Sequence, residues 1–187
     1  GRLDFWRNAN RLVELAFRSG TGAFVLTVDG LTVANQNVLV SPEAQLWVEY
    51  LPAECILPIS IKHGKVTECA FASVVMDQGK SYVYLQTHQL TGRGYQITNE
   101  YYTAQEEEGR AIYRPAELPK GMLPSFYTGS DHPWFALFSP AQLKNLDGGT
   151  GLGMAVFAEA LDQARQCDLA FDNYCRDLYL GGKKVFY

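Results

Sequence analysis

Hydrophobic positions recur with helical spacing near both ends of the chain and alternate with polar ones in between. Apolar side chains in residues 4–18 repeat every three or four positions, which predicts a short amphipathic helix. Asp4 stands where a side chain would cap its first turn, and Ser19-Gly20 is a typical helix end. From there to about residue 114 the period changes to two, as it does in β-strands.

The alternating region divides into short strands separated by turn residues. The expected strands cover residues 23–28, 31–40, 45–50, 55–61, 66–76, 81–91, 95–103 and 110–114. The turns between them are predicted at Asp29-Gly30, His63-Gly64-Lys65, Asp77-Gln78-Gly79-Lys80 and Gly92-Arg93-Gly94. Residues 115–150 carry much of the proline and glycine and predict an irregular connection, with a short buried strand at 135–138.

A second helix is predicted over residues 152–180. Its apolar stripe consists of Phe157, Leu161, Ala164, Phe171, Tyr174 and Leu178. Gly181-Gly182 ends the pattern, and residues 183–187 begin a new strand. Such a helix would be roughly 43 Å long, about as long as the diameter of the whole body, ~40 Å. It either protrudes and packs against another helix or folds back over the sheet, and the pattern leaves both possibilities open.

These elements predict an α+β fold: a mainly antiparallel β-sheet body, an N-terminal amphipathic helix and a long C-terminal helix. The composition is that of a globular protein, with 47% hydrophobic and 19% charged residues among 187. A net charge of -4 argues against tight, sequence-independent DNA binding but allows a protein that DNA slides past. No signal peptide and no membrane span is visible, since a span needs about 18 consecutive apolar residues.

Little in the sequence points to catalysis or to a cofactor. The glycines of residues 148–153 match neither phosphate-loop pattern and are interpreted as a flexible helix entry, with Thr150 as a candidate N-cap. His63, His88 and His132 are scattered, and the four cysteines lack metal-ligand spacing, so we expect free and mostly buried thiols. No catalytic, cofactor-binding or metal-binding residue is therefore predicted, and the chain is expected not to be an enzyme.

Two further groups of residues have competing interpretations. Arg176, Lys183 and Lys184 cluster at the end of the second helix, where cations stabilise the helix dipole, although in an assembly they could face DNA or a neighbouring subunit. Trp6, Trp47 and Trp134 are expected in the core or at an interface. Trp134, beside Pro133 in the long connection, is the one predicted to lie on an assembly contact.

Several segments, in this order, resemble one known family. They are residues 51–58 (LPAECILP), 64–68 (GKVTE), 95–100 (YQITNE), 151–162 (GLGMAVFAEALD), 168–172 (DLAFD) and 180–185 (LGGKKV). Together they resemble the portal proteins of long-tailed phages of Gram-positive bacteria, over nearly the whole chain. Gly182 departs from the family pattern by doubling its single glycine, and residues 104–148 have no clear match.

The resemblance implies a structural subunit of the ring, dodecameric in the particle, through which DNA is packaged and ejected at one capsid vertex. Residues 1–150 would form the wing domain, and residues 151–187 the first stem helix and the start of the clip. Gly1 and the end of the chain inside an expected strand indicate that both ends are cut, so the rest of the clip, the second stem helix and the crown would be missing.

The implied partners are other copies of the chain, scaffold and capsid proteins and, through the clip, the terminase motor and head-completion proteins. DNA would pass without tight binding, and no membrane or cofactor would be involved. The implied location is the portal vertex of the virion and, during assembly of a phage or prophage, the bacterial cytoplasm. Phe157, Leu161, Ala164, Phe171, Tyr174, Arg176, Lys183 and Lys184 are the candidate residues for a subunit interface or the channel. The main alternative is a stand-alone β-rich module that binds a ligand or a peptide, and a hydrolytic enzyme is a distant third.

Overall fold

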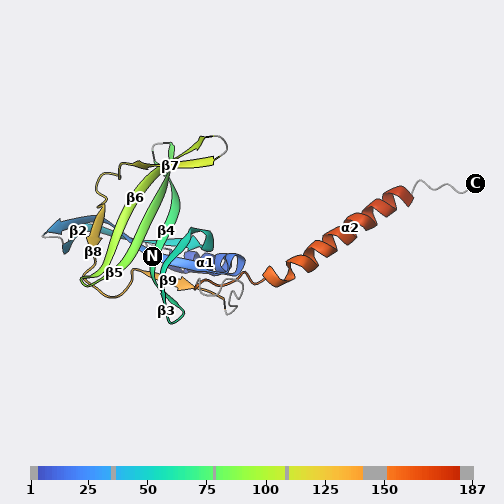
Figure 1. The fold of residues 1–187 in the computed structure, drawn as a ribbon, viewed down its shortest axis with the longest axis horizontal. Helices are drawn as coiled ribbons and strands as arrows, with labels where there is room; N and C mark the ends of the chain where they lie inside the picture. Colours follow the sequence, from blue (N-terminus) through green and yellow to red (C-terminus); the bar gives the residue numbers. More distant parts are fainter. Residues whose placement is uncertain (1–3, 35–36, 78, 108–109, 141–150, 182–187) are drawn as a thin grey trace, which may run out of the picture.

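The fold is a curved β-sheet body with one helix laid on it and a second helix leading away from it (Figure 1). The computed structural model describes residues 4–34, 37–77, 79–107, 110–140 and 151–181. The helices are α1 (Phe5–Ser19), η1 (Ala53–Cys55), η2 (Ala158–Ala160) and α2 (Leu161–Gly181). The strands are β1 (Gly22–Ala34), β2 (Asn37–Pro52), β3 (Ile56–Lys62), β4 (Lys65–Asp77), β5 (Lys80–Thr91), β6 (Gly94–Glu107), β7 (Arg110–Ala116), β8 (Ser125–Tyr127) and β9 (Phe135–Phe138). The predicted α+β class is confirmed.

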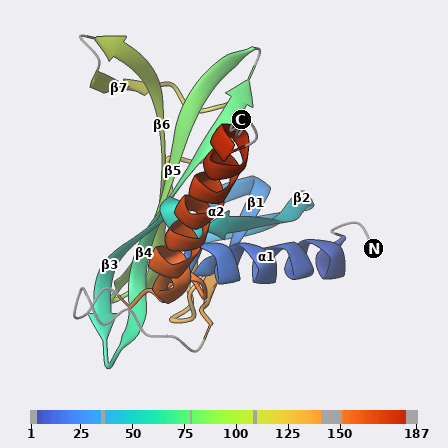
Figure 2. The same cartoon turned by 90° about the vertical axis from the view of Figure 1, so that its right-hand side faces the viewer.

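All nine strands belong to one sheet with the order β3-β4-β5-β6-β8-β2-β1-β9, while β7 pairs with the far end of β6. Every pairing is antiparallel except the single contact between β2 and β8. Figures 1 and 2 show β1 and β2 crossing the long strands β4, β5 and β6 rather than continuing their direction. This curvature brings edge strand β9 back over the inner face of β4, β5 and β6.

The core lies where β9 meets that inner face. The Phe135 ring lies 5.3 Å from the Phe71 ring and 5.4 Å from the His88 ring, measured between centroids. Ala23 and Val25 of β1 are fully buried in the same cluster. Burial of this aromatic and aliphatic surface is the main free-energy contribution that holds the curved sheet closed.

Helix α1 packs on the outer face of β1. Leu12 and Ala16 are fully buried there, and Gly22 allows the close approach because a Cβ at that position would lie 2.7 Å from Leu12 Cδ1. Asp4 occupies the N-cap position as predicted, but its side chain makes no capping hydrogen bond. Gly20 ends the helix in the left-handed conformation, and its N–H donates to the carbonyl oxygen of Ala16.

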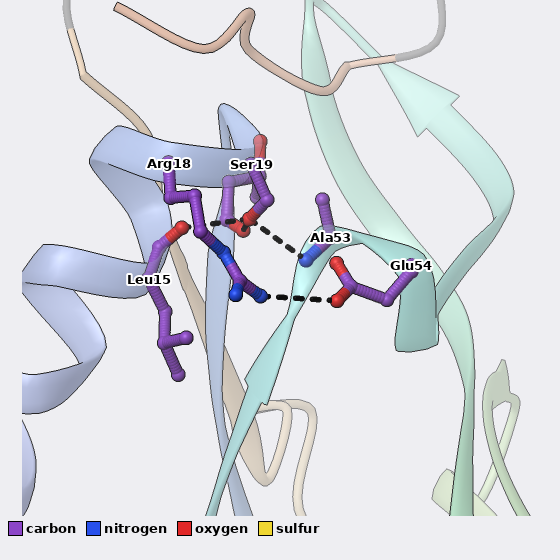
Figure 3. Close-up of polar contacts among 6 residues, drawn as sticks. Leu15, Arg18, Ser19, Ala53 and Glu54 are labelled. Atoms are coloured by element: carbon purple, nitrogen blue, oxygen red, sulfur yellow. Dashed lines mark hydrogen bonds and ion pairs between the residues drawn. The ribbon is translucent and has the colours of Figure 1, made fainter.

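The C-terminal end of α1 is fixed to η1 by the contacts that Figure 3 shows. The Ser19 hydroxyl donates to the carbonyl oxygen of Leu15 and accepts from the backbone N–H of Ala53. Arg18 and Glu54 form an ion pair at 3.3 Å. Since this ion pair is exposed, its contribution to stability is small, and the orientation of the helix depends mainly on the buried Leu12 and Ala16.

Most of the predicted strands are confirmed, but the predicted turn at Asp29-Gly30 is wrong. Strand β1 continues through these residues, and Gly30 (φ 73°) lies at an irregularity where the pairing jumps from Asp29↔Gln45 to Leu31↔Val40. Left-handed Gly30 therefore accommodates a bulge instead of a turn. The predicted turn at His63-Gly64 is confirmed, since both residues have positive φ between Lys62 and its partner Lys65.

Candidate assembly site

Helix α2 is exposed along its whole described length. It leads away from the body in Figure 1. Phe171, Tyr174 and Leu178 keep 65%, 62% and 58% of their surface exposed. Of the two arrangements that the sequence left open, the structure shows the protruding one.

The predicted start of this helix is wrong, because residues 151–157 are not helical. They form a connecting segment on the body, in which the Gly153 N–H donates to Thr21 Oγ1 and the Val156 N–H donates to the carbonyl oxygen of Phe17. Since these N–H groups bond to α1 and its junction with β1, the helical ladder begins only at η2. The described α2 has 21 residues, and at 1.5 Å per residue it is about 32 Å long rather than 43 Å.

The residues predicted for a subunit interface or the channel do not all lie on one face of α2. With 100° between successive residues, Ala164, Phe171, Tyr174 and Leu178 form one stripe on α2, which we call the α2 stripe. Leu161 lies at its border, Phe157 precedes η2, and Arg176 lies on the opposite side of the helix. Lys183, Lys184 and the candidate N-cap Thr150 lie outside the described residues.

The exposure of two cysteines corrects another prediction. Cys69 is buried and Cys55 partly buried, but Cys167 and Cys175 are exposed on α2. Their positions on the helix place them within or beside the α2 stripe. The thiols of this chain are free, as predicted, but only those of the body are shielded from solvent.

A second apolar surface, which the sequence did not predict, lies on the outer face of β1, β2 and β9. Phe24 and Leu26 project on the same face as Gly22, and the register sets Ala136 beside Phe24 and Val48 beside Leu26. Helix α1 covers the Gly22 end of this face and leaves the rest as an open groove of about 310 Å³. The groove is lined by Phe5, Phe24, Leu26, Val48, Pro133, Trp134, Phe135 and Ala136.

Exposed aromatic residues border this groove on α1. Phe5 stacks on Phe24 at 6.1 Å between ring centroids, and Trp6 beside it is 79% exposed. Trp134 lines the groove and packs on Phe126, which belongs to a smaller cluster of buried residues apart from the core around Phe71. One signal in the sequence could have revealed the groove. Residues 23–26 are apolar at every position, so β1 carries Phe24 and Leu26 on the face opposite the buried Ala23 and Val25.

The three histidines lie at separate places in the fold. His88 is fully buried between Phe71 and Phe135, with no hydrogen-bond partner for either ring nitrogen among the described residues. Burial lowers its pKa to about 4, so the ring is neutral at pH 7. His132 lies 3.8 Å from Asp131 at an exposed position, and His63 lies in the turn after β3. In the described part of the chain, no three His, Cys, Asp or Glu side chains converge as metal ligands would.

No family model matches this chain, and no curated protein or solved structure shows significant similarity to it. Within the residues that the structure describes, neither α1 nor α2 combines the length and the apolar character that a membrane-crossing helix needs. The α2 stripe and the groove are two uncovered apolar surfaces among the described residues.

Proposed function

We propose that this chain is a structural subunit of a homo-oligomeric ring, the portal through which phage DNA is packaged and ejected. The single observation that carries the proposal is the wholly exposed α2 with its apolar stripe. An isolated helix of this length is marginal in water, because most helices in proteins are stabilised by packing an apolar face. A helix that finds no such surface on its own chain is suited to packing against another one.

The presence of two different apolar surfaces supports a ring in particular. A subunit of a closed ring contacts one neighbour with one surface and the other neighbour with a different one. In this chain the α2 stripe and the groove are separate surfaces of different shape, one convex and one concave. A twofold dimer would need only one self-complementary surface.

The charge of the chain agrees with a conduit for DNA. Neutralising 6–10 phosphates produces tight, salt-dependent binding, which would slow DNA during packaging. With a net charge of -4, the chain lacks the excess of cations that such binding needs. The portal assignment itself rests on the sequence resemblance. The proposal therefore includes the location in the virion, the docking of the terminase motor and head-completion proteins, and the absence of enzymatic activity.

The experiment is to image the chain, and the longer protein that the resemblance implies, by electron microscopy after sedimentation analysis. Closed rings are expected from the longer protein, together with concentration-dependent association of the chain itself. Phe171→Asp places a charge on the α2 stripe and should abolish rings, whereas the control Leu169→Asp changes an equally exposed residue outside the stripe. A longer protein that stays monomeric at every concentration would contradict the proposal.

One observation favours the alternative, a stand-alone module that binds a ligand or a peptide. The groove of about 310 Å³ is at the lower limit of pockets that hold small molecules, ~300–1,000 Å³. Its lining has no charged side chain among the described residues to orient such a ligand. A monomeric protein that purifies with an apolar molecule bound there would favour the module over the ring.

A further inference from the structure

We propose that the groove on the outer face of β1, β2 and β9 receives the α2 stripe of a second copy of this chain. This inference rests on the proposed ring, and it names the two surfaces that form the contact between neighbouring subunits. The observation behind it is that one chain has both an exposed apolar helix face, the α2 stripe, and an exposed apolar groove.

The chemistry of the groove requires an apolar occupant. Phe24, Leu26, Val48 and Ala136 form its floor, and Phe5 and Trp134 form its sides. Removing such a surface from water is favourable, so a long apolar segment gains more there than a polar one. Leu46, paired with Val28 on the same face, is half exposed and extends the apolar surface along the hairpin.

The α2 helix of the same chain does not supply this segment. The hydrogen bonds of Gly153 and Val156 fix the start of η2 and α2 beside Thr21 and Phe17, at the C-terminal end of α1. Phe5 and the groove lie twelve residues away, about 18 Å along α1. From its starting point α2 leads away from the body (Figure 1). The stripe therefore reaches a groove on a neighbouring copy.

The charges of the two helices are complementary. Helix α1, which forms one side of the groove, carries three arginines and one glutamate, a net charge of +2 that falls to +1 when Arg18 is counted with its partner Glu54. Helix α2 carries four aspartates and two arginines, a net charge of -2. Asp168 lies on the border of the α2 stripe, so a stripe seated in the groove brings a carboxylate toward the α1 side. Two copies of α2 packed on each other would instead bring like charges together.

Cysteine cross-linking tests the contact directly, because Cys167 and Cys175 already lie on α2. Ala136→Cys places a thiol in the lining of the groove, on edge strand β9, and Ala111→Cys on exposed edge strand β7 is the matched control. Burial raises the pKa of the Cys69 thiol to about 12 and also raises that of Cys55, so both react slowly compared with exposed thiols. Mixing isotope-labelled and unlabelled chains identifies links between different copies by mass spectrometry.

The expected result is a link between β9 of one copy and α2 of another, formed with Ala136→Cys and not with Ala111→Cys. Links between two α2 helices alone would overturn the groove contact and leave the proposed ring intact. An apolar molecule that purifies in the groove and protects the introduced thiol would overturn it as well. Absence of every intermolecular link, together with a longer protein that forms no rings, would contradict both proposals.

A second pair of variants measures the strength of the contact. Ala136→Glu sets a charge into the groove, and we expect it to weaken self-association of the chain about tenfold or more. Ala111→Glu introduces the same charge at the distant end of the sheet and should leave association unchanged. Thermal unfolding of both variants checks that each is folded. Equal association constants for the two variants would overturn the inference.

Discussion

The β-sheet body and helix α2 use the same kinds of side chain in opposite ways. Phe71 in β4 is 2% exposed and contacts Phe135 and His88, whereas Phe171 in α2 is 65% exposed. The body encloses the aromatic residues of its core by curving one sheet until β9 covers β4 and β5. Helix α2 has an apolar stripe of similar character but no surface of its own chain to cover it. The difference separates residues that maintain the fold from residues available for assembly.

Truncating Phe71 in the core should cause the largest loss of folding stability. Phe71→Ala leaves a cavity beside Phe135 and His88, and the free energy of unfolding should fall by about 3–5 kcal/mol. Urea denaturation measures the change. Val74→Ala on the same strand, at a position that is 71% exposed, is the control and should change stability by less than ~0.5 kcal/mol. Similar losses in the two variants would show that Phe71 is not part of the core.

The buried imidazole of His88 should make the body sensitive to acid. Its pKa is lowered from 6.5 to about 4 by burial, so below pH 6.5 the unfolded chain binds a proton that the folded chain does not. Stability is therefore unaffected above that pH and falls as the pH drops from about 6.5 to about 4, by ~3 kcal/mol in total. Denaturation at several pH values in this range measures how the free energy of unfolding changes with pH. His88→Leu should remove this pH dependence. An unchanged pH dependence in that variant would assign the acid sensitivity to other groups.

The junction between the two regions depends on Gly20. This residue has a φ of +91°, and a Cβ there would lie 2.4 Å from the carbonyl oxygen of Gly153. Gly20→Ala should cost about 1–3 kcal/mol and release residues 151–157 from α1, which hydrogen exchange at the Val156 amide would detect. Gly121→Ala is the control, since Gly121 has φ +94° but nothing near its missing Cβ. Equal exchange at Val156 in the two variants would argue against this role.

Truncating the exposed phenylalanine should have the smallest effect on stability. Phe171→Ala removes no packing within the chain, so unfolding should change by less than ~0.5 kcal/mol. Self-association measured by sedimentation should nevertheless weaken, while Leu169→Ala, outside the α2 stripe, leaves it unchanged. A large loss of folding stability in Phe171→Ala would mean that α2 packs on its own body in solution, and the contrast between the two regions would then disappear.

Several elements of this fold could be predicted from the sequence because they depend on local preferences. Alternation identified strands β3, β4, β5, β6 and β7, and even the short β9. His63-Gly64 forms the expected turn, since its two positive φ angles match the twist of a two-residue hairpin. The amphipathic period placed α1 within a residue of its observed bounds.

Tertiary structure decided the features that depend on distant partners. Whether Gly30 would form a turn or a bulge depended on how β2 pairs with β1 on either side of it. The first six residues predicted for the second helix, 152–157, are not helical because Thr21 and Phe17 accept the hydrogen bonds of residues 153 and 156. The sequence by itself determined that α2 is amphipathic. Only the fold decided that its stripe stays uncovered, because α2 starts at the far end of α1 and leads away from the groove on the body.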